Sequence, residues 1–148
     1  MVSSVRKATL SDIPGLLELM KAFYSESGYT VNIEKATKAF TVFISNELVG
    51  NVFCAKSENL IIGYVVVKYY YAMGNYGFVC SIDDLFVDKK YRSNKIGSML
   101  IEKVLRVAKE KTISAFNVEV GADNTLAKKL YKKYGFEVRN SGIELMEK

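Results

Sequence analysis

The sequence contains no histidine. This absence excludes a Ser-His or Cys-His nucleophile system and any zinc site built on histidine ligands. Acid–base chemistry would therefore have to use Asp, Glu, Tyr, Cys, Lys or water. Cysteine is scarce as well, because only Cys54 and Cys80 are present, both in apolar strand-like runs and without a C-x-x-C pattern. We expect two reduced thiols in the core, with neither a disulfide nor a metal site.

Long apolar runs are missing too. No stretch is long enough to span a membrane, and residues 1–7 lack the apolar region of a signal peptide. We therefore expect a cytoplasmic protein. The length of 148 residues, without a linker, an internal repeat or a low-complexity segment, predicts one domain over residues 1–148.

The formal net charge is +5, and basic residues cluster locally at 89–95 and 128–133. Such a charge suits either nucleic acid or a small polyanionic ligand. The sequence has no long basic tail and no helix-turn-helix or RNA-binding signature. We therefore expect a small polyanion as partner and no nucleic acid.

Hydrophobic periodicity predicts the order of the secondary structure. Apolar residues at helical spacing, together with cap and stop signals, predict helices at 13–24, 33–45, 95–111 and 125–134. Alternating or β-branched runs predict strands at 2–8, 51–55, 61–71, 78–87, 115–120, 136–139 and 143–146. The first half of this order suits an antiparallel meander that packs on helices.

A short basic turn, residues 91–100, separates the predicted strand at 82–87 from the predicted helix at 95–111. A helix N-terminus leaves backbone N–H groups unpaired, and the helix dipole favours an anion there. Arg92 and Lys95 add positive charge at the same place. The turn therefore predicts a phosphate or pyrophosphate site, although most strand–turn–helix junctions bind nothing.

Three segments together resemble a known family. RSNKIG at 92–97 resembles the coenzyme A motif (R/Q)xxGxG/A, IDDLFV at 82–87 resembles a fourth strand, and NTLAKKLYKKYGF at 124–136 is similar to NxxAxxLYxxxGF. These are motifs of the GCN5-related N-acetyltransferases (GNAT), and they occur here in the family's order. The paired acids before Leu85-Phe86-Val87 and the aromatic strand at 64–71 resemble the diamine (spermidine/spermine) branch, with aminoglycoside acetyltransferases next.

The resemblance implies a single-domain α/β (α+β) fold. Its sheet would be mixed, mostly antiparallel and of about seven strands, flanked by four helices in the order β-α-α-β-β-β-α-β-α-β-β. The implied activity is an acetyl-CoA-dependent N-acetyltransferase acting on a primary amine of a small polyamine-like substrate. The amine would attack directly in a ternary complex, without a metal, in a homodimer. Alternatives are acetylation of an aminoglycoside or protein amine, and a non-catalytic acetyl-CoA-binding module.

The resemblance also implies the coenzyme contacts. The residues that match its motifs are Leu85, Phe86 and Val87 on the strand, Arg92, Ser93, Asn94, Lys95, Ile96, Gly97 and Ser98 in the turn, and Asn124 and Ala127. N–H groups of 93–98 would cradle the pyrophosphate, and the strand would offer main-chain partners to the pantetheine and thioester. Lys95 stands where the family usually has glycine. We expect this lysine to need helical dihedral angles, and either to contact phosphate or to weaken coenzyme binding.

The same resemblance places the catalytic candidates. Tyr131 would protonate the departing thiolate, because a phenol with a pKa near ~10 is a neutral donor at pH 7. Asp83 and Asp84 are candidates to accept the amine proton directly or through water, and position matching favours Asp83, which could also bind the amine. Glu119 and Glu26 are further candidates for amine binding. The plainer alternatives are that Tyr131 is a core residue and that the two aspartates form a satisfied pair.

Overall fold

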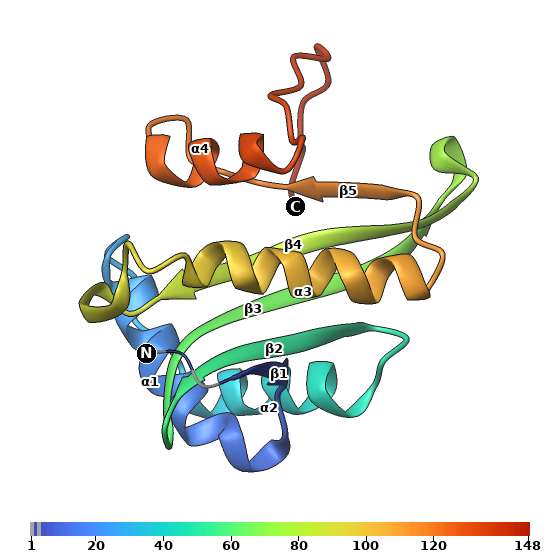
Figure 1. The fold of residues 1–148 in the computed structure, drawn as a ribbon. Helices are drawn as coiled ribbons and strands as arrows, with labels where there is room; N and C mark the ends of the chain where they lie inside the picture. The colour runs from blue at the N-terminus through green and yellow to red at the C-terminus, as the bar shows by residue number, and fades with distance from the viewer. Residues whose placement is uncertain (1, 3) are drawn as a thin grey trace.

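The computed structural model describes residues 2 and 4–148, so Met1 and Ser3 of the predicted N-terminal segment lie outside the described residues. The chain order matches the prediction from the first strand to the fourth helix, with small shifts at the element ends (Figure 1). The strands and helices are β1 (Ser4–Lys7), α1 (Ile13–Ser25), α2 (Ile33–Ser45), β2 (Gly50–Ser57), β3 (Leu60–Ala72), β4 (Gly77–Val87), α3 (Ile96–Glu110), β5 (Ala115–Val118) and α4 (Thr125–Lys133).

One mixed sheet runs in the order β1-β2-β3-β4-β5. The first four strands pair antiparallel with their neighbours, and β5 pairs parallel to β4. A parallel neighbour requires a crossover, and α3 is that crossover. The predicted mixed, mostly antiparallel sheet with four flanking helices is therefore confirmed for the described residues.

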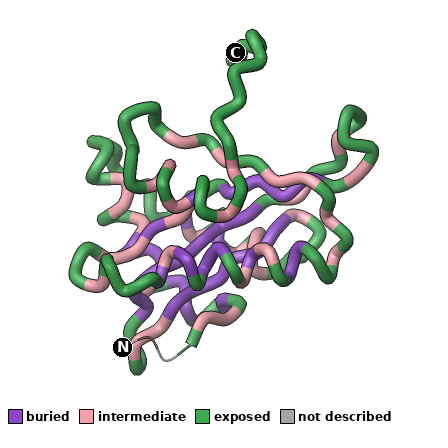
Figure 2. The backbone as a smooth tube through the Cα atoms, turned by 45° about the horizontal axis from the view of Figure 1, so that its top comes forward, coloured by how far each residue is buried: buried purple, intermediate pink, exposed green. Residues whose placement is uncertain are grey.

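Alternation along the central strands divides the core into two clusters. Val52 and Cys54 of β2 face α1 and α2, whereas Phe53 and Ala55 face α3. Figure 2 shows the buried backbone concentrated in the sheet and along the inner side of these helices. Cys54 and Cys80 are free thiols with no exposed surface, as expected of small core residues.

The predicted strands at 136–139 and 143–146 are wrong. The described chain contains five strands rather than about seven, and residues 137–148 are exposed coil that extends away from the body (Figure 2). Alternation alone does not make a strand, because a strand also needs a neighbour for its main-chain hydrogen bonds. No described strand pairs with this segment, so its sequence pattern has no partner within the chain.

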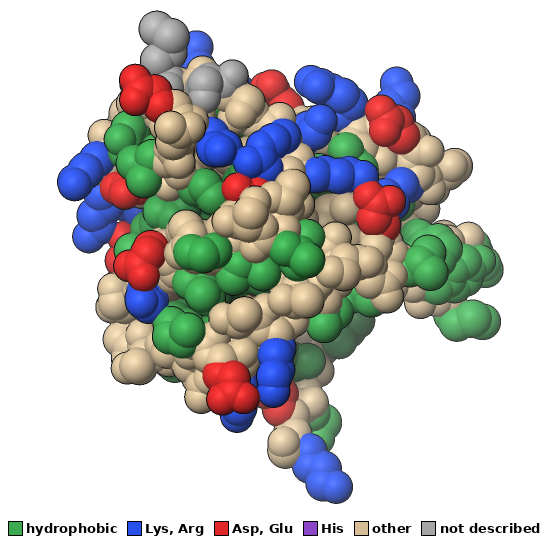
Figure 3. Space-filling view, turned by 90° about the horizontal axis from the view of Figure 1, so that it is seen from below, with side chains coloured by type: hydrophobic (Ala, Val, Ile, Leu, Met, Phe, Trp, Pro, Cys, Tyr) green, Lys and Arg blue, Asp and Glu red, His purple; other side chains and the backbone are tan. Residues whose placement is uncertain are grey.

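The hairpin that joins β3 to β4 carries an exposed apolar surface. Tyr71, Met73 and Tyr76 at its tip are 62%, 84% and 89% exposed. The hairpin projects beyond the helices in Figure 1 and forms an apolar protrusion on the right of Figure 3. Closer to the body, Tyr69 is half-buried and donates a hydrogen bond to Asn51 at 2.6 Å. The aromatic run therefore packs at its base and is solvated at its tip.

Candidate active site

The two parallel strands separate at the middle of the molecule. β4 pairs with β5 only from Val79 to Ile82, and then continues alone to Val87. Along 83–87 the edge of β4 that faces β5 has no strand partner among the described residues. An open strand edge offers main-chain donors and acceptors to an extended ligand. This opening contains Leu85, Phe86 and Val87, the predicted partners of the pantetheine arm.

The basic turn lies directly after β4. The N–H groups of residues 93–98 donate no main-chain hydrogen bond within the described chain, and the first turn of α3 has no acidic residue. Asn94 stabilises the turn by donating from Nδ2 to the carbonyl oxygen of Tyr91 at 3.0 Å. Ile96 is 2% exposed, so its side chain belongs to the core and only its N–H group is available. Free N–H groups at a helix N-terminus without a competing carboxylate fit a pyrophosphate group.

Lys95 does not adopt the helical dihedral angles expected of it. It is the N-cap residue of α3 and has φ +62° and ψ +17°, in the left-handed region. Ser93 is left-handed as well, with φ +67°. The turn therefore keeps the backbone shape that a glycine at position 95 would favour, and the lysine bears steric strain of about 1–2 kcal/mol.

Replacing Lys95 with glycine is expected to stabilise the protein by about 0.5–1 kcal/mol. The substitution removes the left-handed penalty, and the greater freedom of glycine in the unfolded chain offsets part of the gain. Urea unfolding would measure the difference. Lys95→Ala is the matched control, because it removes the same charge but keeps a Cβ, and it should give no increase. Equal stability of the two variants would contradict a strained Lys95.

Arg92 turns toward the end of β4 and away from the free N–H groups of the turn. Its Nε donates to the carbonyl oxygen of Val87 at 2.9 Å, and its guanidinium lies over the Phe86 ring at 5.2 Å. The guanidinium also bonds Glu26 at 3.0 Å, and Lys89 lies 3.6 Å from the same carboxylate. Arg92 therefore brings little unbalanced positive charge to the turn, and Glu26 is already engaged by cations of this chain.

A β-bulge separates the roles of the two neighbouring aspartates. The β3–β4 register passes from Val66–Asp84 to Val67–Ile82, so Asp83 is the extra residue. The Asp83 side chain is 46% exposed and lies 3.1 Å from the Nζ atom of Lys68. Asp84, by contrast, faces the α1 side of the sheet and is half-buried.

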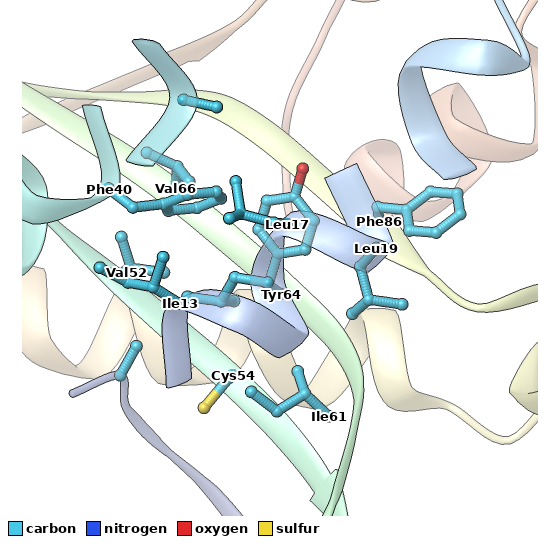
Figure 4. Packing of buried hydrophobic residues seen from close by; sticks show 13 residues of the cluster. Ile13, Leu17, Leu19, Phe40, Val52, Cys54, Ile61, Tyr64, Val66 and Phe86 are labelled. Carbon is cyan, nitrogen blue, oxygen red and sulfur yellow. The ribbon is translucent and has the colours of Figure 1, made fainter. Parts of the chain in front are cut away.

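The Asp84 carboxylate is held by two phenols that sequence reasoning missed. Tyr64 donates to one oxygen at 3.0 Å, and Tyr24, near the end of α1, lies 3.2 Å from the other. The Tyr64 ring is fully buried among apolar side chains and meets the Phe40 ring edge-on at 5.8 Å, which fixes its hydroxyl (Figure 4). In the sequence, only strand alternation could indicate that Tyr64 and Asp84 share one face of the sheet. The bulge shifts this alternation by one residue, so the sequence alone does not reveal the pairing.

The shifted pKa values of the side chains in this cluster suit them for proton transfer. Burial raises the pKa of Asp84, and the charge of Asp83 raises it further, while the hydrogen bonds from Tyr64 and Tyr24 lower it. Burial and then the Asp84 charge raise the pKa of Tyr24 to about 12. Tyr24 is therefore a neutral donor at pH 7, and Asp84 is a carboxylate whose proton affinity exceeds that of an exposed aspartate.

Tyr131 reaches this region from α4. Its ring is 6% exposed and contacts the Phe136 ring at 5.5 Å. Burial, followed by the charge of Asp84, raises the pKa of Tyr131 to about 12, so the two groups lie within electrostatic range. Its hydroxyl has no hydrogen-bond acceptor among the described residues, which leaves the proton available. Gly97 allows this helix to come close, because a Cβ there would lie 3.1 Å from Leu130.

Among the other predicted residues, Asn124 and Ser98 have structural partners. Asn124 caps α4 by accepting a hydrogen bond from the N–H group of Ala127 at 3.2 Å, so that side chain is committed to the helix. Ser98 is buried, and its hydroxyl lies 3.3 Å from the Nζ atom of Lys133. Glu119 follows the end of β5 and is exposed. Sequence spacing alone could not separate these residues from the Asp84 cluster.

The sequence model of the acetyltransferase (GNAT) family matches residues 14–136. The chain belongs to this family. It is an acetyl-CoA-dependent N-acetyltransferase, so the enzyme class and cosubstrate predicted from the three motifs are confirmed. The open edge of β4 and the free N–H groups of the turn suit that cosubstrate.

Known proteins are similar in sequence to this GNAT chain over most of its length. Thialysine N-epsilon-acetyltransferase of Mus musculus is 28% identical over 140 residues, which cover 88% of this chain and 82% of that protein. An uncharacterized N-acetyltransferase of Methanocaldococcus jannaschii is 26% identical over 136 residues, or 90% of this chain. The chain spans 60% of the length of that archaeal protein.

Solved structures show the same fold. The crystal structure of a predicted acetyltransferase with acetyl-CoA from Clostridium acetobutylicum matches with a TM-score of 0.82 at 24% identity, covering 99% of this chain and 96% of that one.

Within the described residues no cluster of three or more His, Cys, Asp or Glu side chains could hold a metal ion. None of the described helices combines the length and apolar character that a membrane crossing requires.

Proposed function

We propose that this acetyltransferase acts on the primary amine of a small polyamine-like substrate, by direct attack in a ternary complex with acetyl-CoA. The observation that carries this proposal is the Asp84 carboxylate, held by Tyr64 and Tyr24 and within electrostatic range of Tyr131. A half-buried anion on the strand whose edge is open is suited to recognise a cationic amine. The similarity to thialysine N-epsilon-acetyltransferases supports a primary amine as acceptor.

The coenzyme would lie along the open edge of β4, with its pyrophosphate at the N–H groups of 93–98. The amine arrives mostly protonated, because an alkyl ammonium has a pKa near ~10. Asp84 accepts its proton, directly or through water. The neutral amine then attacks the thioester carbon and forms the C–N bond of a tetrahedral intermediate. As the C–S bond breaks, the nitrogen of this intermediate loses its second proton to solvent, and Tyr131 gives its proton to the departing thiolate. Solvent afterwards restores the proton of Tyr131 and removes that of Asp84.

Two alternatives are included in the test below. Aminoglycoside acetyltransferases share the fold at 18–19% identity, which speaks for the fold alone. A non-catalytic acetyl-CoA-binding module is the alternative that Lys95 raises, because it is the N-cap of α3 where the family usually has glycine. A cytoplasmic location stays a prediction.

Calorimetric titration with acetyl-CoA, followed by an amine panel, tests the proposal. We expect binding at one site per chain with a dissociation constant on the order of micromolar. Spermidine, putrescine, thialysine, an aminoglycoside and a lysine peptide would then be compared by release of free thiol. Preference for the linear amines supports the proposal. Binding without turnover of any amine favours the non-catalytic module, and preference for the aminoglycoside or the peptide favours those substrates instead.

A further inference from the structure

A primary amine of the chain itself lies at the point where β4 and β5 separate. Lys68 of β3 places its Nζ atom 3.1 Å from a carboxylate oxygen of Asp83. Asp83 directly follows Ile82, the last residue of β4 that pairs with β5, and therefore begins the open edge at 83–87. The ammonium group of Lys68 thus lies at the inner end of this opening.

Lys68 also shares a face of the sheet with Asp84. Val66 lies opposite Asp84 in the β3–β4 register, and Lys68 follows Val66 by two residues, so its side chain leaves β3 on the same face. Two residues of a strand span only about 7 Å. The structure pairs other lysines with glutamates that lie outside β4: Lys7, Lys21, Lys38 and Lys89.

The Lys68 amine is accessible and weakly held. Its side chain is 48% exposed, and that of its partner Asp83 is 46% exposed. An exposed ion pair of this kind contributes about 0–1 kcal/mol, so the ammonium group can leave the carboxylate at little cost. Solvent on the outer side of the strand also leaves room for an added acetyl group.

We propose that Lys68 is an internal acetyl acceptor, which this acetyltransferase modifies with its own acetyl-CoA. The inference rests on the proposed function for the position of the coenzyme. With the pyrophosphate at the N–H groups of 93–98, the coenzyme runs along the open edge from Val87 toward Asp83, which brings the thioester to the end where the Lys68 amine lies. Tethering to β3 supplies this amine without a separate binding step.

The transfer follows the chemistry of the free amine. The Lys68 ammonium leaves Asp83 and gives one proton to Asp84 or to water, and the neutral Nζ attacks the thioester carbon. The C–N bond forms, the nitrogen loses its second proton to solvent, and the C–S bond breaks as Tyr131 gives its proton to the thiolate. The product is an uncharged amide, which can no longer form the ion pair with Asp83. Each chain therefore accepts one acetyl group at this position.

Incubation of the purified chain with acetyl-CoA and without added amine tests the proposal. We expect thiol release to stop at about one per chain, because the tethered acceptor is used once. Peptide mapping by mass spectrometry should place the acetyl group on Lys68, and a group already present before incubation counts toward this total. Lys38 is the matched control, since it is 75% exposed and paired with Glu34 at 3.3 Å on α2. It should be acetylated at least about tenfold more slowly than Lys68.

Two variants separate enzymatic transfer from direct chemical acetylation by acetyl-CoA. Asp84→Asn should slow the modification of Lys68 by on the order of 10²-fold and leave the slow background at Lys38 unchanged. Lys68→Arg removes the acceptor but keeps a cation that can pair with Asp83, so thiol release without added amine should fall at least about tenfold. The rate constant in the intact chain should not change over an about tenfold range of protein concentration, because donor site and acceptor lie in one chain.

Three results would overturn the inference. An unmodified Lys68 would do so, and parallel turnover of an added linear amine would then show that the proposed function still holds. Equal labelling of Lys68 and Lys38 would indicate chemical acetylation only. A rate that rises with protein concentration would mean that one chain modifies another. Modification of Lys68 at the expected rate without turnover of any added amine would support the internal acceptor and contradict the proposed substrates.

Discussion

Asp84→Asn is expected to lower kcat/KM by on the order of 10²–10³-fold, which is typical for the loss of a general base. Asparagine keeps the size of the side chain and can still accept a hydrogen bond from Tyr64, but it cannot accept the amine proton. Affinity for acetyl-CoA should stay within about twofold by calorimetry, because the turn at 93–98 is untouched. Steady-state kinetics on the best amine of the panel would measure the loss.

Asp83→Asn is the matched control. It removes the neighbouring carboxylate, which is exposed and paired only with Lys68. Exposed ion pairs contribute about 0–1 kcal/mol, so kcat/KM should change by no more than about fivefold. The opposite result, with a large loss in Asp83→Asn and full activity in Asp84→Asn, would assign the base to Asp83, as position matching suggested.

The pH profile gives an independent reading of the same group. Because burial raises the pKa of Asp84, kcat/KM of the intact enzyme should fall as the pH drops through that raised value and the carboxylate becomes protonated. Above it the carboxylate is charged and competent. The pH profile of the Asp84→Asn variant should lack this fall of kcat/KM at acidic pH. It should keep the pH dependence that comes from deprotonation of the amine. An unchanged fall at acidic pH in the variant would argue against Asp84 as the titrating group.

Tyr131→Phe should lower kcat by on the order of 10²-fold and leave coenzyme affinity nearly unchanged. The variant keeps the ring that packs on Phe136 and loses only the hydroxyl, whose proton has no acceptor among the described residues. With a pKa of about 12, this hydroxyl is neutral at pH 7 and can donate to a departing thiolate. Single-turnover kinetics of thiol release would show the defect in the chemical step.

Tyr134→Phe is the matched control for Tyr131. It removes a phenol oxygen from the residue that ends α4, where the hydroxyl donates to Glu102 at 2.7 Å on the outer side of α3. The same hydroxyl also lies 3.4 Å from the carbonyl oxygen of Ser98. We expect thiol release within about threefold of the intact enzyme, since this deletion removes these two hydrogen bonds and leaves the N–H groups of the turn in place. Equal rates in Tyr131→Phe and the intact enzyme would leave Tyr131 as a core residue and nothing more.

Sequence patterns predicted the helices and strands well where each element packs against another element of the same chain. Helical spacing along α3 and β-branched runs in β3 specify both the element and the face it buries, and those elements are confirmed. The segment at 136–146 shows the limit of pattern alone. Its alternation is strand-like, but a pattern carries no information on whether a neighbouring edge is within reach.

For the candidate site, sequence motifs and structure select the same region, but they differ in detail. The motif at 92–97 predicts an anion site at the turn before α3, and that stays a prediction. The expectation of helical dihedral angles at Lys95 was wrong, because those angles depend on how the whole turn is closed. Adjacent aspartates are equivalent in a sequence. Only the register of β4 against β3 decides which of them faces α1, and a bulge shifts that register by one residue. Tyr24 is brought to Asp84 from a distant element, which no local pattern reports.

The ion pair between Arg92 and Glu26 joins the coenzyme turn to the end of α1, two residues after Tyr24. A ligand that repositions the turn therefore also acts on the helix that carries one of the phenols at Asp84. Thermodynamic linkage makes such an effect reciprocal: whatever factor acetyl-CoA applies to amine affinity, the amine applies to acetyl-CoA. Because both partners are partly solvated, the pair transmits about 0–1 kcal/mol, or at most about a fivefold change in either affinity. The two substrates are thus expected to bind in random order with weak cooperativity.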